Sequence, residues 1–358
     1  MKPIRFGASV STTGRYALQG RQALAGLRAW EAHANSAGGV GSPGRGAGLP
    51  VDLVVHDDAS SSTKAALNVE RLIVDDRVDV LIGPYGSDLV RAAAPVAARH
   101  GRLMWNQGGA SDDIHRLDGR IVGILTPVSR YFTGFLDAIA NARSAAQSVV
   151  SLYREGSPFG RLAAQGVEAE CRANGIANTP LPYSSLRSGM PELLVRVLEL
   201  QPDIVLSAGS FKDDCTLARE LVAKGMGATA FGCVAAGVQE FGRMLGAAAE
   251  GIVGPSQWEP GGEWQADCGP SGSVVTRGVE ALGATPDYPA AQAYAACLIA
   301  QRCLEMAGSA EDERLWESAC ALDCTTFFGP FRIDPDTGLQ LAKQMVWVQW
   351  IDGKKQVV

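Results

Sequence analysis

Residue types that suit ligand binding concentrate in residues 78–111, VDVLIGPYGSDLVRAAAPVAARHGRLMWNQGGAS. Their order predicts strand, tight turn, helix, strand and tight turn, with Gly83-Pro84 and Gly108-Gly109 ending the two strands. Ser87 stands where a helix N-cap is expected, ahead of an Ala-rich helix that Gly101 ends. Parallel strands end at one edge of their sheet, and open α/β sheets bind ligands just outside that edge. A Ser hydroxyl, exposed N–H groups and a helix N-terminus there suit a carboxylate or carbonyl oxygen.

Motifs for catalysis, metals and nucleotides are absent from the sequence. Asp57 and Asp58 are paired carboxylates without a clustered third ligand, so we expect them to cap the helix that follows. Gly39, Gly41 and Gly44 match GxGxxG by letter, but they follow an expected helix rather than a strand. The four histidines are scattered, and no GxSxG, HExxH or P-loop occurs. The sequence therefore predicts no enzyme, no metal site and no cofactor.

The eight cysteines contain no CxxC pair, so neither a zinc site nor a thioredoxin-like motif is predicted. Several lie within apolar helical runs, where a free buried thiol is expected. Cys320 and Cys324 are close enough in sequence to meet within one helical turn, but we predict no disulfide there.

Length and composition indicate a globular protein of 358 residues with two domains, 46% hydrophobic and 20% charged residues. The net charge of −6 argues against a nucleic-acid partner, which needs a basic face. No apolar run reaches ~18 residues, so no membrane-spanning helix is expected. The first expected strand begins at Ile4 without a charged-then-apolar leader, so either the native protein is cytoplasmic or a leader has been removed.

Strands and helices alternate through the chain. Up to residue 125 the pattern predicts α/β structure with a doubly wound parallel sheet, and its expected strands are 4–10, 51–59, 78–83, 102–106 and 119–125. Thr126-Pro127 interrupts the pattern, which restarts with an expected helix over 129–144 and includes an expected loop over 179–185. From about residue 255 we expect a loop, a long buried helix over 288–308, and a tail of strands joined by a DPDTG turn and a DG turn.

The chain resembles the type I periplasmic binding-protein family nearly from end to end. The resemblance is to the branch that contains the Leu/Ile/Val-binding proteins and the cytoplasmic amide sensors of amidase operons. It rests on the order and spacing of STTGRYALQG, NSAGGVG, DDASSSTKAA, VDVLIGPYGS, LMWNQGGAS and GPFRID…GLQLAKQMVWVQWIDGK.

This resemblance implies two α/β lobes with a ligand cleft between them and closure by hinge motion. The implied N-terminal lobe is 1–125 plus 255–328, and the implied C-terminal lobe is 126–254 plus 329–358. The three implied crossovers lie near Leu125–Pro127, Val253–Ser256 and Phe328–Phe331.

Residue by residue, Ser87 matches the family's ligand-binding Ser, and Tyr85 is similar to an aromatic residue of the amide sensors. Gly109 and Ala110 match the pair that holds a ligand carboxylate in the amino-acid binders. Phe159 and Phe211 stand where those proteins have Tyr, and Trp105 is similar to an aromatic at the pocket floor. Each also has a purely structural explanation: a helix cap, a turn or core packing. The implied ligand-binding set is Tyr85, Gly86, Ser87, Trp105, Gln107, Gly108, Gly109, Ala110, Arg130, Tyr131, Phe159, Phe211, Val234 and Ala235.

Departures from the family pattern bear on the ligand. The amino-acid binders have a Glu that pairs with the ligand ammonium, whereas Val234 or Ala235 stands near that position here. A buried ammonium without a carboxylate costs several kcal/mol, so an ordinary α-amino acid is disfavoured. Arg130 either pairs with an anion or is a solvated charge at a helix start. An aromatic or other apolar carboxylic acid fits this balance best.

The resemblance implies an extracytoplasmic solute-binding protein of an ABC importer, located in the periplasm, with an ABC permease as partner. The alternative is a cytoplasmic ligand sensor that regulates a partner protein. Either function involves a small-molecule ligand and neither requires a cofactor.

Overall fold

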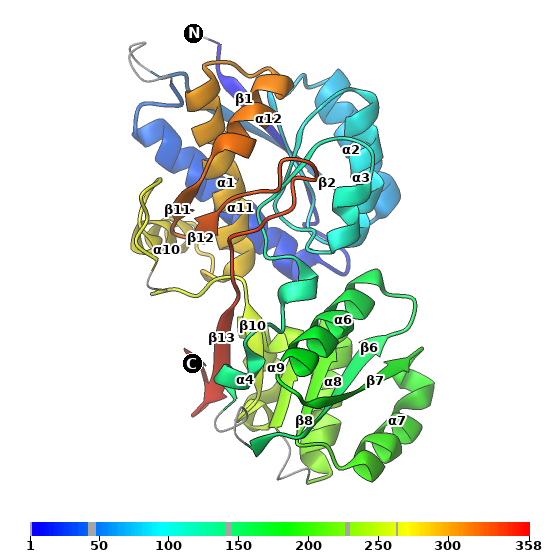
Figure 1. Ribbon diagram of the computed structural model, residues 1–358. Coiled ribbons are helices and arrows are strands. Elements are labelled where there is room, and N and C mark those ends of the chain that lie inside the picture. The colour runs from blue at the N-terminus through cyan, green and yellow to red at the C-terminus, as the bar shows by residue number, and fades with distance from the viewer. Residues whose placement is uncertain (1, 42–47, 140–144, 226–229, 263) are drawn as a thin grey trace. The chain divides into compact units, whose positions relative to one another are not determined.

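The computed structural model describes residues 2–41, 48–139, 145–225, 230–262 and 264–358 (Figure 1). The chain forms two compact units, Met1–Pro127 with Trp258–Gln344 and Val128–Gln257 with Met345–Val358. The first two boundaries lie close to those implied at residues 125 and 254, but the third, implied at residue 328, is wrong. Residues 329–344 pack with the first unit because β12 (Gly329–Phe331) pairs with β11 (Cys324–Thr326) and the N–H of Gly123 donates to the Gly338 carbonyl at 2.8 Å.

The first unit contains an all-parallel sheet, as the alternating pattern predicts. Its order is β2-β1-β3-β4-β5. The strands are β1 (Ile4–Val10), β2 (Val51–Asp57), β3 (Val80–Ile82), β4 (Met104–Asn106) and β5 (Ile121–Gly123).

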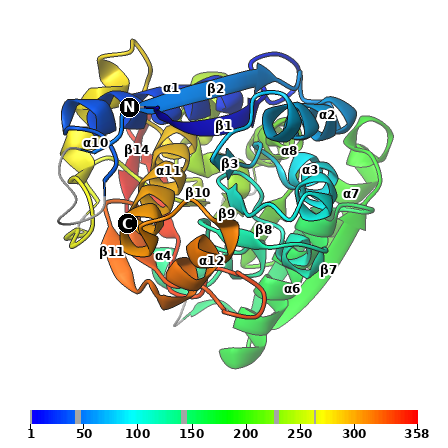
Figure 2. The same ribbon diagram turned by 90° about the horizontal axis from the view of Figure 1, so that it is seen from above.

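Helices cover both faces of this sheet. On one face α1 packs against α11, and Phe6 of β1 contacts Trp30 of α1 at 4.4 Å between ring centroids. On the other face α2 and α3 share a core with Leu81 and Met104. Figure 2 shows α2 and α3 next to each other. The helices are α1 (Ala17–Ser36), α2 (Ser62–Val74), α3 (Ser87–Arg99), α10 (Gly272–Glu280), α11 (Tyr288–Ala307) and α12 (Asp312–Ala321), with a 3₁₀ turn at Asp112–Arg116. The residue pattern of the sequence predicted neither α10 nor α12.

The second unit contains a mixed sheet in the order β14-β13-β10-β9-β8-β6-β7. Five neighbouring strands, from β10 to β7, are parallel, and β13 and β14 add an antiparallel hairpin. The strands are β6 (Ser148–Arg154), β7 (Ala177–Tyr183), β8 (Ile204–Ala208), β9 (Ala230–Cys233), β10 (Val253–Ser256), β13 (Val346–Ile351) and β14 (Lys354–Val357).

Two local predictions for this unit are corrected. The loop expected over 179–185 is largely strand β7, whose Pro180 and Pro182 are tolerated because β7 is at the sheet edge. The crossover expected at Val253–Ser256 is strand β10, and the chain leaves the second unit after Gln257.

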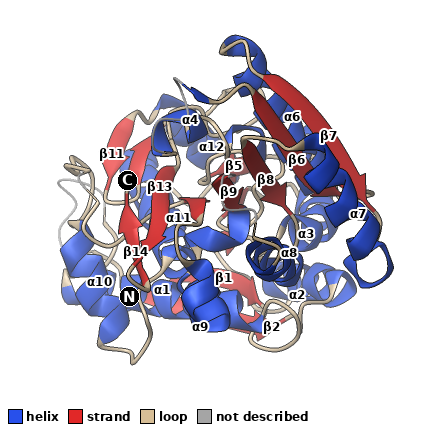
Figure 3. Cartoon of the chain, turned by 90° about the horizontal axis from the view of Figure 1, so that it is seen from below, coloured by secondary structure: helices blue, strands red, loops and turns tan. Residues whose placement is uncertain are grey.

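The second unit's helices are α4 (Phe135–Ala138), α6 (Pro158–Ala173), α7 (Leu186–Leu200), α8 (Phe211–Ala223) and α9 (Gln239–Leu245), with 3₁₀ turns at Val128–Arg130, Val234–Gly237 and Gly246–Ala249. Helices α7, α8 and α9 share one core with the sheet (Figure 3). The continuous helix predicted over 129–144 is wrong up to residue 139, because Gly134 adopts φ +79° and separates a 3₁₀ turn from α4. The rest of that predicted helix, 140–144, lies outside the described residues.

Both predicted turns in the tail are confirmed. Asp334 accepts from the N–H groups of Asp336 and Thr337 within the DPDTG turn. Asp352 and Gly353 have φ of +51° and +70° and join β13 to β14. Across the residues that the structure describes, we find no helix long and apolar enough to cross a membrane.

Candidate functional site

Sheet topology gives each unit one preferred place for a ligand. In the first unit β2 and β3 flank β1, so the chain direction across the sheet reverses between β1 and β3. The second unit repeats the arrangement, with β7 and β8 flanking β6. Ligands of doubly wound sheets bind outside the carboxyl ends of the strands at such a switch point. The relevant turns therefore follow β1 and β3 in the first unit and β6 and β8 in the second.

The turns after β3 and β4 meet in the first unit, as the sequence analysis predicts. Tyr85 and Gly108 form a parallel bridge, and the N–H of Gly86 donates to the Gly108 carbonyl at 2.8 Å. A Cβ on Gly108 would lie 2.4 Å from the Tyr85 Cα and 2.6 Å from the Pro84 carbonyl oxygen. Only glycine permits this close approach of the two turns.

Ser87 is placed differently from the prediction. It is the first residue of α3, and Gly86 is the N-cap, so the expected capping role of the Ser87 side chain is wrong. Instead, the Ser87 Oγ accepts from the N–H of Ser111 at 3.0 Å. The hydroxyl proton of Ser87 remains available to a ligand acceptor, and the side chain is partly exposed.

Some of the backbone N–H groups after β4 already donate to protein acceptors, and others do not. Asn106 Oδ1 accepts from the N–H of Gly109 at 2.8 Å and from that of Gly108 at 3.3 Å. The implied use of the Gly109 N–H by a ligand is therefore corrected, because that donor is occupied. Within the described part of the chain no acceptor is found for the N–H of Ala110, a residue that is 8% exposed. Ala110 is the backbone donor left for a ligand at this turn.

An aromatic group that the sequence analysis missed borders this turn. Tyr16 follows the turn after β1, and its ring meets the Tyr85 ring edge to face at 5.8 Å. The Tyr16 hydroxyl donates to Asp88 at 2.8 Å, and the Tyr85 and Tyr288 hydroxyls lie 3.1 Å apart. Burial raises the pKa of Tyr85 to about 12, so its phenol is neutral at physiological pH. The position of Tyr16 in the STTGRY segment was the available signal.

Trp105 and Gln107 lie in the core of the first unit, and both side chains are fully buried. The Gln107 Nε2 donates to the Gly83 carbonyl at 3.1 Å, which ties the two turns together. Within the described residues the Trp105 Nε1 and the Gln107 Oε1 have no partner. Burial favours core packing for Trp105, the alternative that the sequence analysis left open.

In the second unit the switch point carries the two phenylalanines. Phe159 is the second residue of α6 and Phe211 the first residue of α8, so each follows a strand that borders the switch point. The Phe159 ring meets the Tyr131 ring edge to face at 5.6 Å, and the Tyr131 hydroxyl accepts from Gln257 at 3.1 Å. Both phenylalanines are partly exposed.

A buried carboxylate lies beside Ala235, near the position where the resemblance implies the family's Glu. Asp214 of α8 accepts from the Ser207 hydroxyl at 2.7 Å, the Gly209 N–H at 2.9 Å and the Ala235 N–H at 3.1 Å. Burial raises the pKa of Asp214 from 3.8 to about 7, against the effect of these three donors. Asp214 therefore joins β8, α8 and the turn after β9, and sequence spacing alone gave no signal for its contact with Ala235.

The remaining implied residues are placed but gain no ligand role from geometry alone. Val234 begins the 3₁₀ turn after β9 and is partly exposed, while Ala235 is buried. Arg130 ends the 3₁₀ turn that opens the second unit and is partly exposed. Their contact with a ligand stays a prediction.

The paired aspartates after β2 organise a loop rather than a helix end. Asp57 accepts from the Thr12 N–H at 2.9 Å and from the Thr13 hydroxyl at 2.7 Å, while Asp58 accepts from the Ser9 hydroxyl at 3.0 Å. The N-cap of α2 is Ser61. The capping role predicted for the aspartates is therefore wrong. Among the described residues no cluster of three or more His, Cys, Asp or Glu side chains suits a metal.

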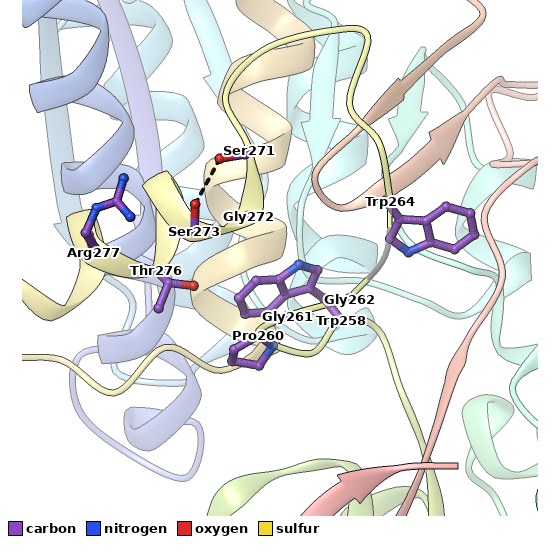
Figure 4. A pocket seen from close by; sticks show the side chains of 10 residues that line it. All are labelled: Trp258, Pro260, Gly261, Gly262, Trp264, Ser271, Gly272, Ser273, Thr276 and Arg277. Carbon is purple, nitrogen blue, oxygen red and sulfur yellow. Dashed lines mark hydrogen bonds between the residues drawn. The ribbon is translucent and has the colours of Figure 1, made fainter.

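One cavity of about 420 Å³ lies in the first unit away from all the implied residues (Figure 4). In Figure 4 the Trp258 side chain extends toward Thr276, whereas the Trp264 ring points away from the other residues that line the cavity. Its lining residues are Trp258, Pro260, Gly261, Gly262, Trp264, Ser271, Gly272, Ser273, Thr276 and Arg277.

Comparison with known proteins agrees with this architecture. The family model described as periplasmic binding protein matches residues 3–355. A leucine-binding protein of Thermotoga maritima has a TM-score of 0.83 at 19% identity, over 99% of this chain and 97% of that one.

Two further similar structures contain different bound ligands. A branched-chain amino acid transporter substrate-binding protein of Streptococcus pneumoniae, in complex with isoleucine, has a TM-score of 0.81 at 17% identity, over 100% of this chain and 99% of that one. A solute-binding protein of an ABC transporter from Rhodopseudomonas palustris, in complex with p-hydroxybenzoic acid, has a TM-score of 0.82 at 18% identity, over 99% and 95%. At these identities the likeness is one of fold.

Proposed function

The chain belongs to the periplasmic binding protein family, and from this premise we propose that it is an extracytoplasmic solute-binding protein that delivers a small carboxylate to an ABC importer. The observation that carries the choice of ligand is the donor pair at the first unit's switch point, the Ser87 hydroxyl and the Ala110 N–H. Two donors beside the start of α3 suit an anionic oxygen, because the helix dipole adds a favourable field.

A missing counter-charge supports an acid rather than an α-amino acid. Val234 and Ala235 offer no carboxylate, and the nearby Asp214 already accepts three hydrogen bonds through its two oxygens. A ligand ammonium would have to displace one of these donors or stay unpaired, and either outcome costs free energy. A ligand without an ammonium group avoids this cost.

The aromatic residues at the second switch point support an apolar ligand body. Phe159 and Phe211 offer apolar ring surfaces where the resemblance implies more polar Tyr side chains in the amino-acid binders, and the Tyr131 ring packs against Phe159. The Rhodopseudomonas palustris relative named above holds p-hydroxybenzoic acid, so this fold accommodates aromatic acids elsewhere in the family. We propose that one ligand engages both switch points, the carboxylate at Ser87 and Ala110 and the ring at the phenylalanines.

A thermal-shift series tests this function on the full chain. Benzoate, 4-hydroxybenzoate, an aliphatic acid, leucine, isoleucine and benzamide are compared at equal concentration. A ligand that binds only the folded protein raises the melting temperature through RT ln(1 + [L]/Kd). We expect a shift with the aromatic acids and none with leucine, isoleucine or the amide.

Two results would change the proposal in different ways. A shift with leucine or isoleucine would show that another group pairs with the ammonium. A shift with benzamide that exceeds the shift with benzoate would favour the amide-sensor function, and the anion site at Ser87 would be abandoned.

A further inference from the structure

Two cysteines that are far apart in sequence meet in the first unit. Cys268 lies in the segment before α10, and Cys324 is the first residue of β11. The two thiols lie close enough to shift each other's pKa, downward for Cys268 and upward for Cys324. Sequence spacing pointed to Cys320 and Cys324, which are four residues apart, because spacing along the chain does not predict contacts between distant residues.

The backbone around the two thiols is firmly held. The N–H groups of Asp267 and Cys268 both donate to the Thr325 carbonyl, at 2.9 and 3.1 Å. In return, the Thr325 N–H donates to Asp267 Oδ1 at 2.8 Å. These three bonds fix residues 267–268 against Thr325, so the backbone holds Cys268 next to the start of β11, where Cys324 lies.

The pair also differs in reactivity from other cysteines of the chain. The neighbouring Cys324 thiol lowers the pKa of Cys268 and favours the Cys268 thiolate, the form that attacks disulfides, whereas the pKa of Cys324 is raised. Burial raises the pKa of Cys171 to about 11 and that of Cys215 to about 12, so these two stay protonated and unreactive. Cys268 is 8% exposed and Cys324 is partly exposed, so an oxidant reaches the pair from the Cys324 side.

We propose that Cys268 and Cys324 form a disulfide bond when the protein meets a disulfide oxidant. With oxidised glutathione, Cys324, the more exposed thiol, attacks one sulfur and breaks the S–S bond, and its proton goes to the glutathione thiolate that leaves. The Cys268 thiolate then attacks the Cys324 sulfur and expels the second glutathione. Two protein thiols lose two electrons and two protons, and one glutathione disulfide becomes two thiols.

Neighbouring groups support a disulfide over a metal site. Cys303 of α11 lies close enough to affect the titration of Cys324, and Cys320 of α12 lies close enough to affect that of Cys303. Nevertheless, no metal-binding arrangement of three or more ligands occurs in the described part of the chain. An oxidising compartment, where the proposed function places the protein, preserves such a bond, although the chemistry itself does not depend on that function.

The bond would clamp one wall of the cavity in Figure 4. Two residues that line the cavity flank Cys268 in the sequence: Trp264 comes four residues before it and Ser271 three residues after it. At the far end of the same segment, the Trp258 Nε1 donates to the Phe327 carbonyl at 3.1 Å, next to β11. A disulfide would therefore join this segment covalently to a hairpin that it already contacts twice.

Thiol counting and peptide mapping test the proposal on the full chain. The protein is treated either with oxidised glutathione or with dithiothreitol, alkylated in denaturant and digested. We expect the free thiols to fall from the eight of the sequence to six, with one peptide pair linking Cys268 to Cys324. Retention of all eight thiols, or a link that uses another pair such as Cys320 with Cys324, would overturn it.

Melting temperatures provide the second measurement. The bond closes a loop of more than 50 residues, so the oxidised protein is expected to melt about 5 °C higher than the reduced one. Cys268→Ser and Cys324→Ser should abolish the difference. The matched control is Cys320→Ser, a partly exposed neighbour, which should keep it. If Cys320→Ser also abolishes the difference, the assignment of the pair is wrong, and mapping of the wild-type chain decides the question even where a variant does not fold.

Discussion

At the scale of single residues, ligand binding depends on donors that the fold leaves unused. Ser87 and Ser111 illustrate the distinction. The Ser87 Oγ accepts from the Ser111 N–H and still has its proton to donate, whereas the buried Ser111 hydroxyl is committed to Asp113 at 2.5 Å. Two serines that contact each other therefore have different expected roles.

Ser87→Ala should weaken binding of the acid found in the thermal-shift series by about 1–2 kcal/mol, because one ligand oxygen loses a buried donor. Isothermal titration calorimetry gives the change in Kd. Ser111→Ala is the control, since it keeps the N–H that contacts position 87. Equal affinity of the wild type and Ser87→Ala would remove Ser87 from the site.

Asp214 provides a test through pH. Its folded pKa is about 7 and its ordinary value is 3.8, so between about pH 4 and pH 7 the folded protein keeps a proton that the unfolded chain releases. Stability from this group is therefore fully present below pH 4 and is lost as the pH rises through 7.

Asp214→Asn should remove this dependence and also lower stability by about 1–3 kcal/mol, because the new NH₂ group faces an N–H or O–H donor. Denaturant unfolding of both proteins at pH 4.5 and pH 7.5 provides the comparison. We expect the cost of the substitution to be larger at pH 4.5. A cost that is equal at the two pH values would contradict the raised pKa.

At the scale of elements, the geometry at the carboxyl edge of the first unit's sheet depends on contact between the turns after β3 and β4. Glycine at position 108 permits the Tyr85 bridge, and the Asn106 side chain folds the following residues back on themselves. This geometry orients the Ala110 N–H, so the shape of the turn decides which donor a ligand can use.

Gly108→Ala should therefore disturb both stability and binding. Its Cβ would meet the Tyr85 Cα at 2.4 Å, so the two turns must separate. We expect a loss of about 1–3 kcal/mol in unfolding free energy, as for other overpacked sites, together with weaker ligand binding. Gly189→Ala in α7 is the control, since its Cβ meets nothing within 4 Å. That helical substitution should be neutral or stabilising by up to about 1 kcal/mol. Wild-type stability in Gly108→Ala would show that the turns are not tightly joined.

At the scale of the whole molecule, each unit has a sheet and core of its own, and the chain passes between the units three times. A few short chain segments that connect two compact units are suited to act as hinges. The proposed engagement of both switch points by one ligand predicts that binding changes the arrangement of the two units.

Small-angle X-ray scattering checks this prediction. Saturation with the acid that raises the melting temperature should lower the radius of gyration, while a non-binding amino acid at the same concentration should leave it unchanged. A radius that stays constant at saturation would argue against hinge closure, even if the affinity is high.

The sequence determined much of the local structure and predicts where the ligand site lies. Short apolar runs ended by Gly-Pro and Gly-Gly predict the strands and their turns, because backbone restriction at Gly and Pro acts within a few residues. The alternation of strands and helices predicts the doubly wound sheet, and position along the chain puts Tyr85, Ser87, Phe159 and Phe211 at strand ends that the structure brings to the switch points.

Tertiary structure alone decided the features that rest on long-range contacts. Asn106 occupies the Gly109 N–H and leaves that of Ala110, Asp214 reaches Ala235, and Cys268 meets Cys324. Strand β7 contains two prolines and forms because it has an edge position, and residues 329–344 return to the first unit through the β11–β12 hairpin. Each of these outcomes depends on which residues from distant parts of the chain come into contact. Residue type and local spacing do not predict those contacts.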